Sequence, residues 1–257
     1  MNTAVLTLRQ SRYEMRAFWR NPASAFFTFV FPLMFLVIFN VVLGNQDFGV
    51  HGGEIDASTF YVPAILAFSV ITACYTNVAM SITFARDRGI LKRIRGTPLP
   101  AAAFLGGRII QAVIVAIMLV VLVLAAGIVF YGVDLQSDRV PALFVSLVVG
   151  AAAFCALGLA ITGFVPNADA APAVVNVSVL PLLFISNIFI PTSESPAWLN
   201  DFASLFPVVH FARALHAAFN PFETGSAFEV KDLIIVAAWG LAGVAVALRY
   251  FTWEPRR

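Results

Sequence analysis

The sequence predicts an all-α integral membrane protein, and three observations support this fold class. Of the 257 residues, 60% are hydrophobic and only 12% are charged, whereas a soluble domain carries roughly 25% charged residues. Six apolar stretches could cross a bilayer, and the basic residues concentrate in alternate connecting segments. Two cysteines exclude a disulfide-stapled scaffold, and a net charge of +2 excludes a typical nucleic-acid-binding protein.

Each predicted span rests on a run without Asp, Glu, Lys or Arg, because a helix needs about 20 mostly apolar residues to cross a bilayer. Such runs cover 21–46, 57–85, 109–133, 140–168 and 170–193, and a shorter one covers 233–248. We therefore expect six transmembrane helices, near 24–44, 61–84, 108–130, 141–164, 171–190 and 231–250. Together they predict a single membrane domain over residues 1–257.

The distribution of charge predicts that both termini lie in the cytoplasm. Of the 16 lysines and arginines, only Arg139, Arg213 and Lys231 fall on the side opposite the termini. Basic residues favour the cytoplasmic side of a membrane, so an even number of spans with both ends inside is expected.

The segment before the first predicted span is expected to form an amphipathic helix. Its arginines recur at intervals of three and four residues, which places them on one helical stripe: Arg9, Arg12, Arg16 and Arg20. Such a helix would lie in the membrane interface with its arginines at anionic lipid headgroups. A basic tail that only sets the topology is the alternative.

A second amphipathic helix is predicted in the cytoplasmic segment after the second span. Within 86–95, the apolar Ile90, Leu91 and Ile94 share one face, and basic residues share another. Gly96 and Pro98 then provide a stop signal. We favour a docking element, because a segment that only supplied positive charge would need neither the apolar face nor the stop.

The 191–230 connection is predicted to dip into the membrane from the outer face. Asp201 and Arg213 bracket 11 charge-free residues, too few to cross. Pro207 favours two short helices with a break between them, after a turn at 193–196. His210 and His216 are six residues apart, which suits packed histidines better than a shared metal ion.

The sequence predicts no catalytic residues and no metal site. It contains no G-x-x-x-x-G-K-[ST], H-E-x-x-H or G-x-S-x-G motif, and its spans hold essentially no charges for an ion pathway. The energy for any transport must then come from a partner. Within the spans, polar residues serve by default as helix–helix contacts and alternatively line a substrate path; the candidates for that path are Asn77, Ser81, Asn176 and Asn187.

Three regions together resemble the ABC-2 family of ATP-binding-cassette exporter permeases, most closely the drug-resistance permeases of the daunorubicin-export type. They are Arg20-Asn21-Pro22 with Phe31-Pro32, then Arg86-Asp87-Arg88-Gly89-Ile90-Leu91-Lys92-Arg93-Ile94-Arg95-Gly96-Thr97-Pro98-Leu99, and finally Ser186-Asn187-Ile188-Phe189-Ile190-Pro191 with Ser195-Pro196-Ala197-Trp198-Leu199. The resemblance covers nearly the whole chain. It departs from the family where Asp87 stands for a common Glu, where Arg88 stands for a second acid, and where Asn187 stands for a frequent Gly.

The resemblance implies a multi-pass permease of the bacterial plasma membrane that forms half of a translocation pathway with a second, identical or paralogous, permease. A separate ATPase subunit would bind ATP and Mg, and this chain would bind no cofactor. The 86–95 helix would be the coupling helix that docks on the ATPase, through Arg86, Asp87, Gly89, Ile90, Leu91, Arg93, Ile94 and Arg95. The N-terminal helix would move with it, and the 191–220 segment would gate the exit.

The cargo implied by the resemblance is a small amphiphilic drug or antibiotic. Lipids and polysaccharide precursors remain open as alternatives within the same family. A stand-alone carrier or channel is the competing class, and the capped cytoplasmic helix argues against it.

Overall fold

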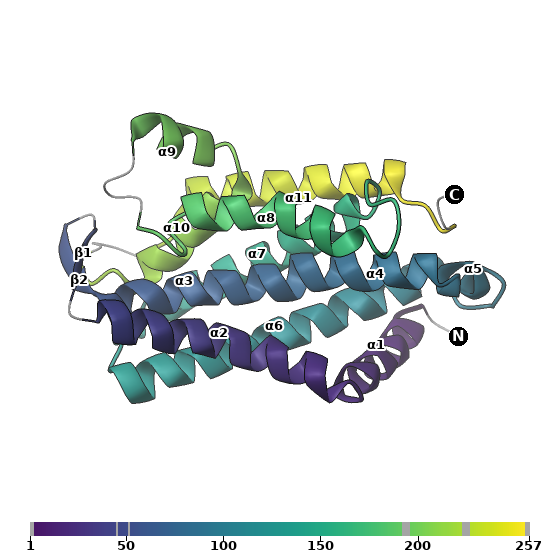
Figure 1. The fold of residues 1–257 in the computed structure, drawn as a ribbon, viewed down its shortest axis with the longest axis horizontal. Coiled ribbons are helices and arrows are strands. Elements are labelled where there is room, and N and C mark those ends of the chain that lie inside the picture. The colour runs from purple at the N-terminus through teal and green to yellow at the C-terminus, as the bar shows by residue number, and fades with distance from the viewer. Residues whose placement is uncertain (1–2, 45, 51, 192–195, 223–226, 255–257) are drawn as a thin grey trace.

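The computed structural model describes the chain except residues 1–2, 45, 51, 192–195, 223–226 and 255–257. The described part is an elongated bundle of helices with a short β-hairpin at one end (Figure 1). In chain order the elements are α1 (Thr3–Trp19), α2 (Pro22–Leu43), β1 (Asp47–Val50), β2 (Gly53–Asp56), α3 (Ala57–Ile71), the π-helical turn η1 (Thr72–Thr76), α4 (Asn77–Asp87), α5 (Ile90–Arg95), α6 (Ala101–Tyr131), α7 (Val140–Ile161), α8 (Ala171–Ile185), α9 (Ala197–Ala203), α10 (Pro207–Phe219) and α11 (Val230–Tyr250).

Five of the six predicted spans are present as helical stretches long and apolar enough to cross a membrane. Among the described residues these stretches are Pro22–Leu43, Ala57–Asp87, Ala101–Tyr131, Val140–Ile161 and Val230–Tyr250. The second is continuous, because α3, η1 and α4 follow one another without a break. The all-α membrane fold class is confirmed.

The fifth predicted span is shorter than expected. The sequence indicates a helix over 171–190, but α8 has 15 residues and ends at Ile185. At 1.5 Å per residue it is about 22 Å long, against about 30 Å of hydrocarbon. Residues 186–190 leave the helix, and Asn187 has a positive φ of 61°. The charge-free run therefore predicts where this helix begins but not the residue at which it ends.

The two ends of the bundle differ in what they hold. One end, hereafter the α5 end, holds α1, α5 and the C-terminal part of α11, so that both termini lie there (Figure 1). The opposite end, hereafter the hairpin end, holds β1, β2, α9 and α10. Both termini therefore lie at the same end, as an even number of crossings requires.

The core is built around α3, which is buried along nearly its whole length, whereas α2 is exposed over most of its surface. Helices α7 and α11 pack closely because glycines face small residues between them. A Cβ on Gly240 would lie 2.9 Å from the Cα of Ala153, and one on Gly243 would lie 3.0 Å from the backbone nitrogen of Leu157. Small residues at such crossings let helix backbones approach in a membrane.

The β-hairpin was not anticipated from the sequence. Its strands pair in an antiparallel arrangement with Phe48 opposite Ile55, and the ring of Phe48 stacks on Phe60 with centroids 4.9 Å apart. The Asp56 carboxylate then accepts a 2.6 Å hydrogen bond from the Ser58 hydroxyl at the start of α3. The hairpin thus covers the beginning of the buried helix.

The predicted pair of short helices around Pro207 is present as α9 and α10. The two helices meet at 98°, and Pro207 occupies the first position of α10. In α10, one ring nitrogen of His210 contacts the carboxylate of Asp232 on α11, and the other lies 2.8 Å from the carbonyl oxygen of Ser204. His210 is thus a packed residue, as expected. Most of the predicted turn at 193–196 lies outside the described residues.

Candidate functional site

A short helix is present at the α5 end where the sequence predicts a docking element, and it is shorter than the expected 86–95 helix. Residues 86 and 87 complete α4, and Arg88 and Gly89 form a turn in which Gly89 has a left-handed φ of 71°. Helix α5 follows and ends at Arg95, and the Thr97 hydroxyl donates a 2.7 Å bond to the carbonyl oxygen of Ile94. Glycine suits this turn because other residues rarely adopt that φ.

The apolar face of α5 is divided between the interior and the surface. Leu91 has no exposed area and belongs to the core, and Ile94 is half-buried against that core. Ile90 remains 38% exposed beside the exposed cations Lys92 and Arg93. Of the three apolar side chains expected to meet a partner, only Ile90 is therefore well placed to do so in this subunit.

Arg86 points into the protein rather than toward a partner, which differs from the expectation. Its side chain is 1% exposed and donates to the carbonyl oxygens of Thr162 at 2.7 Å and Val165 at 2.6 Å. The neighbouring Asp87 carboxylate accepts a 3.2 Å bond from the backbone N–H of Ala168. These residues fasten the end of α4 to the loop between α7 and α8. Sequence patterns carry no signal for these bonds, because the acceptors are backbone groups far along the chain.

The N-terminal helix is amphipathic, with its arginine stripe turned outward. Arg9, Arg12, Arg16 and Arg20 are all exposed. The opposite side lies on α6, where a Cβ on Gly107 would come within 2.6 Å of the Gln10 side chain. On that side Glu14 forms an ion pair with Arg108 of α6 at 3.3 Å.

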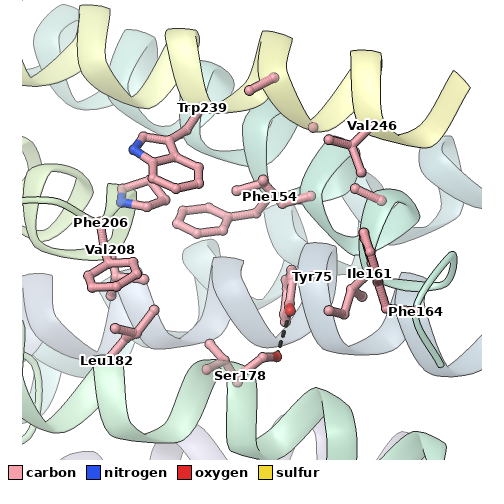
Figure 2. Close-up of a pocket in the computed structure, with 16 residues that line it drawn as sticks. Tyr75, Phe154, Ile161, Phe164, Ser178, Leu182, Phe206, Val208, Trp239 and Val246 are labelled. Carbon is pink, nitrogen blue, oxygen red and sulfur yellow. Dashed lines mark hydrogen bonds between the residues drawn. The ribbon is translucent and has the colours of Figure 1, made fainter. Parts of the chain in front are cut away.

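A mostly apolar cavity lies between α7, α8, α10, α11 and the π-helical turn η1 (Figure 2). It has a volume of about 260 Å³, and we call it the lateral groove. Its walls are formed by Tyr75, Phe154, Leu157, Ala160, Ile161, Phe164, Ser178, Val179, Leu182, Phe206, Pro207, Val208, Trp239, Ala242, Gly243 and Val246. Phe164 is 55% exposed and Trp239 36% exposed, so the groove opens to the outside of this chain.

The polar feature of the lateral groove is a hydrogen bond between Tyr75 and Ser178. The two hydroxyl oxygens lie 2.6 Å apart (Figure 2). Because the Ser178 hydroxyl donates its proton to the carbonyl oxygen of Val175 at 2.6 Å, Tyr75 must be the donor to Ser178. The groove therefore offers a hydroxyl pair on an otherwise apolar and aromatic wall.

The π-helical turn explains why sequence patterns did not single out Tyr75. A π-turn inserts an extra residue into a helix, so it changes which side chains face a given direction beyond that point. Gly158 of α7 lies against this turn, since a Cβ there would be 2.7 Å from the Tyr75 carbonyl oxygen. Interruptions of this kind are frequent at functional sites.

The four polar residues predicted to line a substrate path lie in three separate places. Asn77 and Ser81 line a cavity at the α5 end, between α1, α2, α4 and α6. Asn176 lies on an open face of α8, and Asn187 lies in a polar cavity at the hairpin end. The structure thus groups only Asn77 with Ser81, and none of the four lines the lateral groove.

The cavity that contains Asn77 and Ser81 is hereafter the α5-end cavity. Its volume is about 330 Å³. Its lining combines charged, amide, hydroxyl and aromatic side chains: Glu14, Ala17, Phe18, Asn21, Ser24, Asn77, Ser81, Phe84, Ala85, Arg88, Ile90, Arg108 and Gln111.

The polar cavity at the hairpin end lies beneath the β-hairpin and beside α10. Its volume is about 470 Å³, and Asn187, Asn200, Arg213, Glu229 and Asp232 contribute polar atoms to its lining. His216 also lines it, with a ring nitrogen 3.3 Å from the carbonyl oxygen of Asn187. His216 is thus also a packed histidine, as expected.

Comparison with known proteins assigns the chain to a family. Residues 6–220 match the family described as ABC-2 type transporter. The chain is 24% identical over 217 residues to the inner membrane transport permease YadH of Escherichia coli strain K12, covering 84% of this chain and 80% of the relative. It is 23% identical over 226 residues to the putative transport permease ycf38 of Pyropia yezoensis, covering 86% and 75%.

A third relative is named as a probable doxorubicin resistance ABC transporter permease protein, DrrC, of Mycobacterium tuberculosis strain CDC 1551. The identity is 23% over 212 residues, which cover 81% of this chain and 75% of the relative. The family match spans most of the chain and the helices are those of a multi-pass membrane protein. The chain therefore belongs to the ABC-2 type transporter family, as one of its membrane permeases.

Proposed function

We propose that this ABC-2 membrane subunit forms half of an exporter that a separate ATPase subunit drives and that carries amphiphilic compounds. ATP and Mg would be bound by the ATPase, and a second permease, identical or paralogous, would complete the pathway. The α5 end would face the cytoplasm, as the distribution of basic residues predicts. The name of the doxorubicin-resistance relative supports an amphiphilic drug as cargo.

The observation that carries the proposal is the bonding of Arg86 and Asp87. Helix α5 follows directly on α4, and these two residues fasten the end of α4 to the loop between α7 and α8. A displacement of α5 is therefore passed to α7 and α8, which are two walls of the lateral groove. A partner that pushes on α5 could change the shape of the groove without touching it.

The exposed part of α5 suits an acidic docking partner. Ile90 supplies an apolar contact, and Lys92, Arg93 and Arg95 are exposed cations around it. Leu91 and Arg86 would hold the helix in place from inside. The docking surface we propose is thus smaller than the whole 86–95 segment.

The lateral groove suits the apolar part of an amphiphile. Its volume is just below the roughly 300 Å³ of the smallest ligand sites, so it would take one ring system and leave a polar part outside. Aromatic rings of Phe154 and Trp239 offer stacking surfaces, and Tyr75 with Ser178 offers a hydrogen-bonding partner (Figure 2).

The first test is co-purification with an ATPase subunit and measurement of coupled ATP hydrolysis. Ile90→Asp should abolish association or coupling without lowering thermal stability. Leu205→Asp is the matched control, because Leu205 is an exposed apolar residue at the hairpin end. Unchanged association of the Ile90→Asp variant would overturn the docking proposal. Robust solute flux through the reconstituted permease alone would show a stand-alone carrier instead.

The second test fills the lateral groove. Val246→Trp should raise the amphiphile concentration that half-stimulates ATP hydrolysis by about tenfold, the effect of losing one well-packed contact of about 1.4 kcal/mol. Val244→Trp is the control, because Val244 is exposed on α11 and is not part of the groove lining. Equal effects of both variants, or stimulation by charged metabolites only, would contradict an amphiphile site in the groove.

A further inference from the structure

We propose that the α5-end cavity binds the phosphate headgroup of an anionic phospholipid from the adjacent leaflet. This site is separate from the lateral groove and does not depend on the transport function proposed above. Its lining combines three amides, two hydroxyls and two arginines with one carboxylate. Its position, its unpaired amides and its charge each point to this ligand.

The cavity lies at the depth of lipid headgroups. Helix α6 carries no charged residue from 109 to 131, a length of about 35 Å that matches the hydrocarbon thickness of about 30 Å. Arg108, immediately before that stretch, lines the cavity and so marks the membrane surface at the α5 end. Trp19 stacks on Phe29 nearby, with centroids 5.7 Å apart, and Trp is typical of this interfacial depth.

Helix α1 forms one wall of the cavity and lies at an angle to α2 (Figure 1). Its outward arginines would hold it at an anionic surface. A lipid in that leaflet would therefore have its phosphate beside the cavity before any binding takes place.

Two amides in the cavity lack partners within the described part of the chain. Gln111 of α6 is only 8% exposed, Asn77 of α4 is half-buried, and neither amide forms a hydrogen bond with a described residue. Buried polar side chains in folded proteins nearly always have hydrogen-bond partners. The amide of Gln111 therefore indicates a ligand that accepts hydrogen bonds, and the amide of Asn77 lines the same cavity.

The charges around the cavity select an anion. Both oxygens of Glu14 are already engaged, one by Gln10 at 2.8 Å and the other by Arg108 at 3.3 Å. Arg88 lines the cavity as an exposed cation, and it forms no ion pair with an acid in the described chain. Asn21 and Ser24 place the N-terminus of α2 at the cavity, and its dipole also favours an anion.

The apolar part of the lining favours a lipid over a soluble anion. The aromatic rings of Phe18 and Phe84 line the same cavity as the polar groups. They would cover the glycerol and the first carbons of the acyl chains, whereas a free phosphate would leave this surface unused.

The test is lipid binding to the purified full-length permease, measured by native mass spectrometry and by the rise of the unfolding temperature. The probes are phosphatidylglycerol and phosphatidylcholine with the same acyl chains. We expect phosphatidylglycerol to bind at least about fivefold more tightly, which corresponds to one added cation–anion contact of about 1 kcal/mol. Arg88→Gln and Gln111→Leu should each remove most of this preference.

Two variants serve as controls of matched chemistry. Lys231→Gln removes an exposed cation from the start of α11, at the hairpin end, and Asn176→Leu removes an amide from the open face of α8. Both should retain the preference. An equal loss with Lys231→Gln, equal binding of the two lipids, or an unchanged preference in both cavity variants would overturn the proposal. Equal protection by sn-glycerol 3-phosphate, which lacks acyl chains, would assign the cavity to a soluble anion and overturn the lipid.

Discussion

The Arg86 side chain on α4 donates a 2.6 Å hydrogen bond to the carbonyl oxygen of Val165, in the loop that joins α7 to α8. A second bond, of 2.7 Å, reaches the carbonyl oxygen of Thr162 at the end of α7. The last carbonyls of a helix have no partner within the helix. One guanidinium therefore caps α7 and connects it to the helix that precedes α5.

Replacing Arg86 should destabilise the fold and also impair transport. In Arg86→Gln the buried carbonyls of Thr162 and Val165 lose their donors, at a cost of about 1–3 kcal/mol. We expect a lower unfolding temperature in detergent, followed by intrinsic tryptophan fluorescence. Arg93→Gln is the control, since Arg93 is exposed on α5 and its replacement should leave the temperature unchanged. Equal stability of the two variants would show that the Arg86 bonds contribute little.

Gly158 is expected to tolerate no side chain. A Cβ there would lie 2.7 Å from the carbonyl oxygen of Tyr75 and 3.0 Å from that of Cys74, both on the backbone of η1. Gly158→Ala should therefore separate α7 from η1 and cost about 1–3 kcal/mol, the usual range for overpacking. Thermal unfolding measures the loss. Gly49→Ala, where a Cβ would meet nothing within 4 Å, should have almost no effect.

Four of the predicted spans, near 24–44, 108–130, 141–164 and 231–250, correspond to single helices because their apolar runs end at charges or turns. In the sequence, the last apolar run is bracketed by Lys231, Asp232 and Arg249. In the structure, these residues lie in the first and last turns of α11. The distribution of charge also predicts that both termini lie on the same side, and in the structure both lie at the α5 end. These features depend on local composition, which the sequence displays directly.

The remaining features depend on contacts between distant residues. Leu91 and Ile90 are adjacent and chemically alike, yet one is buried and the other exposed, because the neighbouring helices cover only one side of α5. Asn176 and Asn187 are both polar residues in an apolar run, yet Asn176 lies on an open face of α8 and Asn187 lines a cavity at the hairpin end. The lateral groove was not predicted, because its walls come from five separate segments and one of them is shifted by a π-turn.

Tyr75 and Ser178 should be energetically coupled. The Tyr75 hydroxyl of η1 donates to the Ser178 hydroxyl of α8, so Tyr75→Phe and Ser178→Ala each remove the same bond. A double-mutant cycle on the free energy of unfolding should give a coupling of about 0.6 kcal/mol, the average for hydrogen bonds between membrane helices. Strictly additive effects would show that the bond does not form. If the groove binds cargo, Tyr75→Phe should also shift the preference of stimulated ATP hydrolysis toward less polar amphiphiles.

The contact between His210 and Asp232 should hold the hairpin end together. It joins α10 to α11 and both side chains are buried, so removal of one partner leaves an unpaired polar group in the interior. Asp232→Leu is expected to cost about 3–5 kcal/mol, the range for breaking a buried pair. Limited proteolysis from the hairpin side should then cut the α9–α10 region faster. Asp201→Leu is the control, because Asp201 is exposed on α9, and equal cutting of both variants would refute the role of the pair.

The two neighbouring residues of α5 should separate folding from docking. Leu91 has no exposed area, so Leu91→Ala should create a cavity and cost about 2–5 kcal/mol in the free energy of unfolding. Ile90 is 38% exposed, so Ile90→Ala should leave the unfolding temperature nearly unchanged and weaken only the association with an ATPase subunit. The test measures the unfolding temperature and the association with an ATPase subunit for each of the two variants. If Ile90→Ala lowered stability as much as Leu91→Ala, the exposed side chain would be part of the core and α5 would need another docking surface.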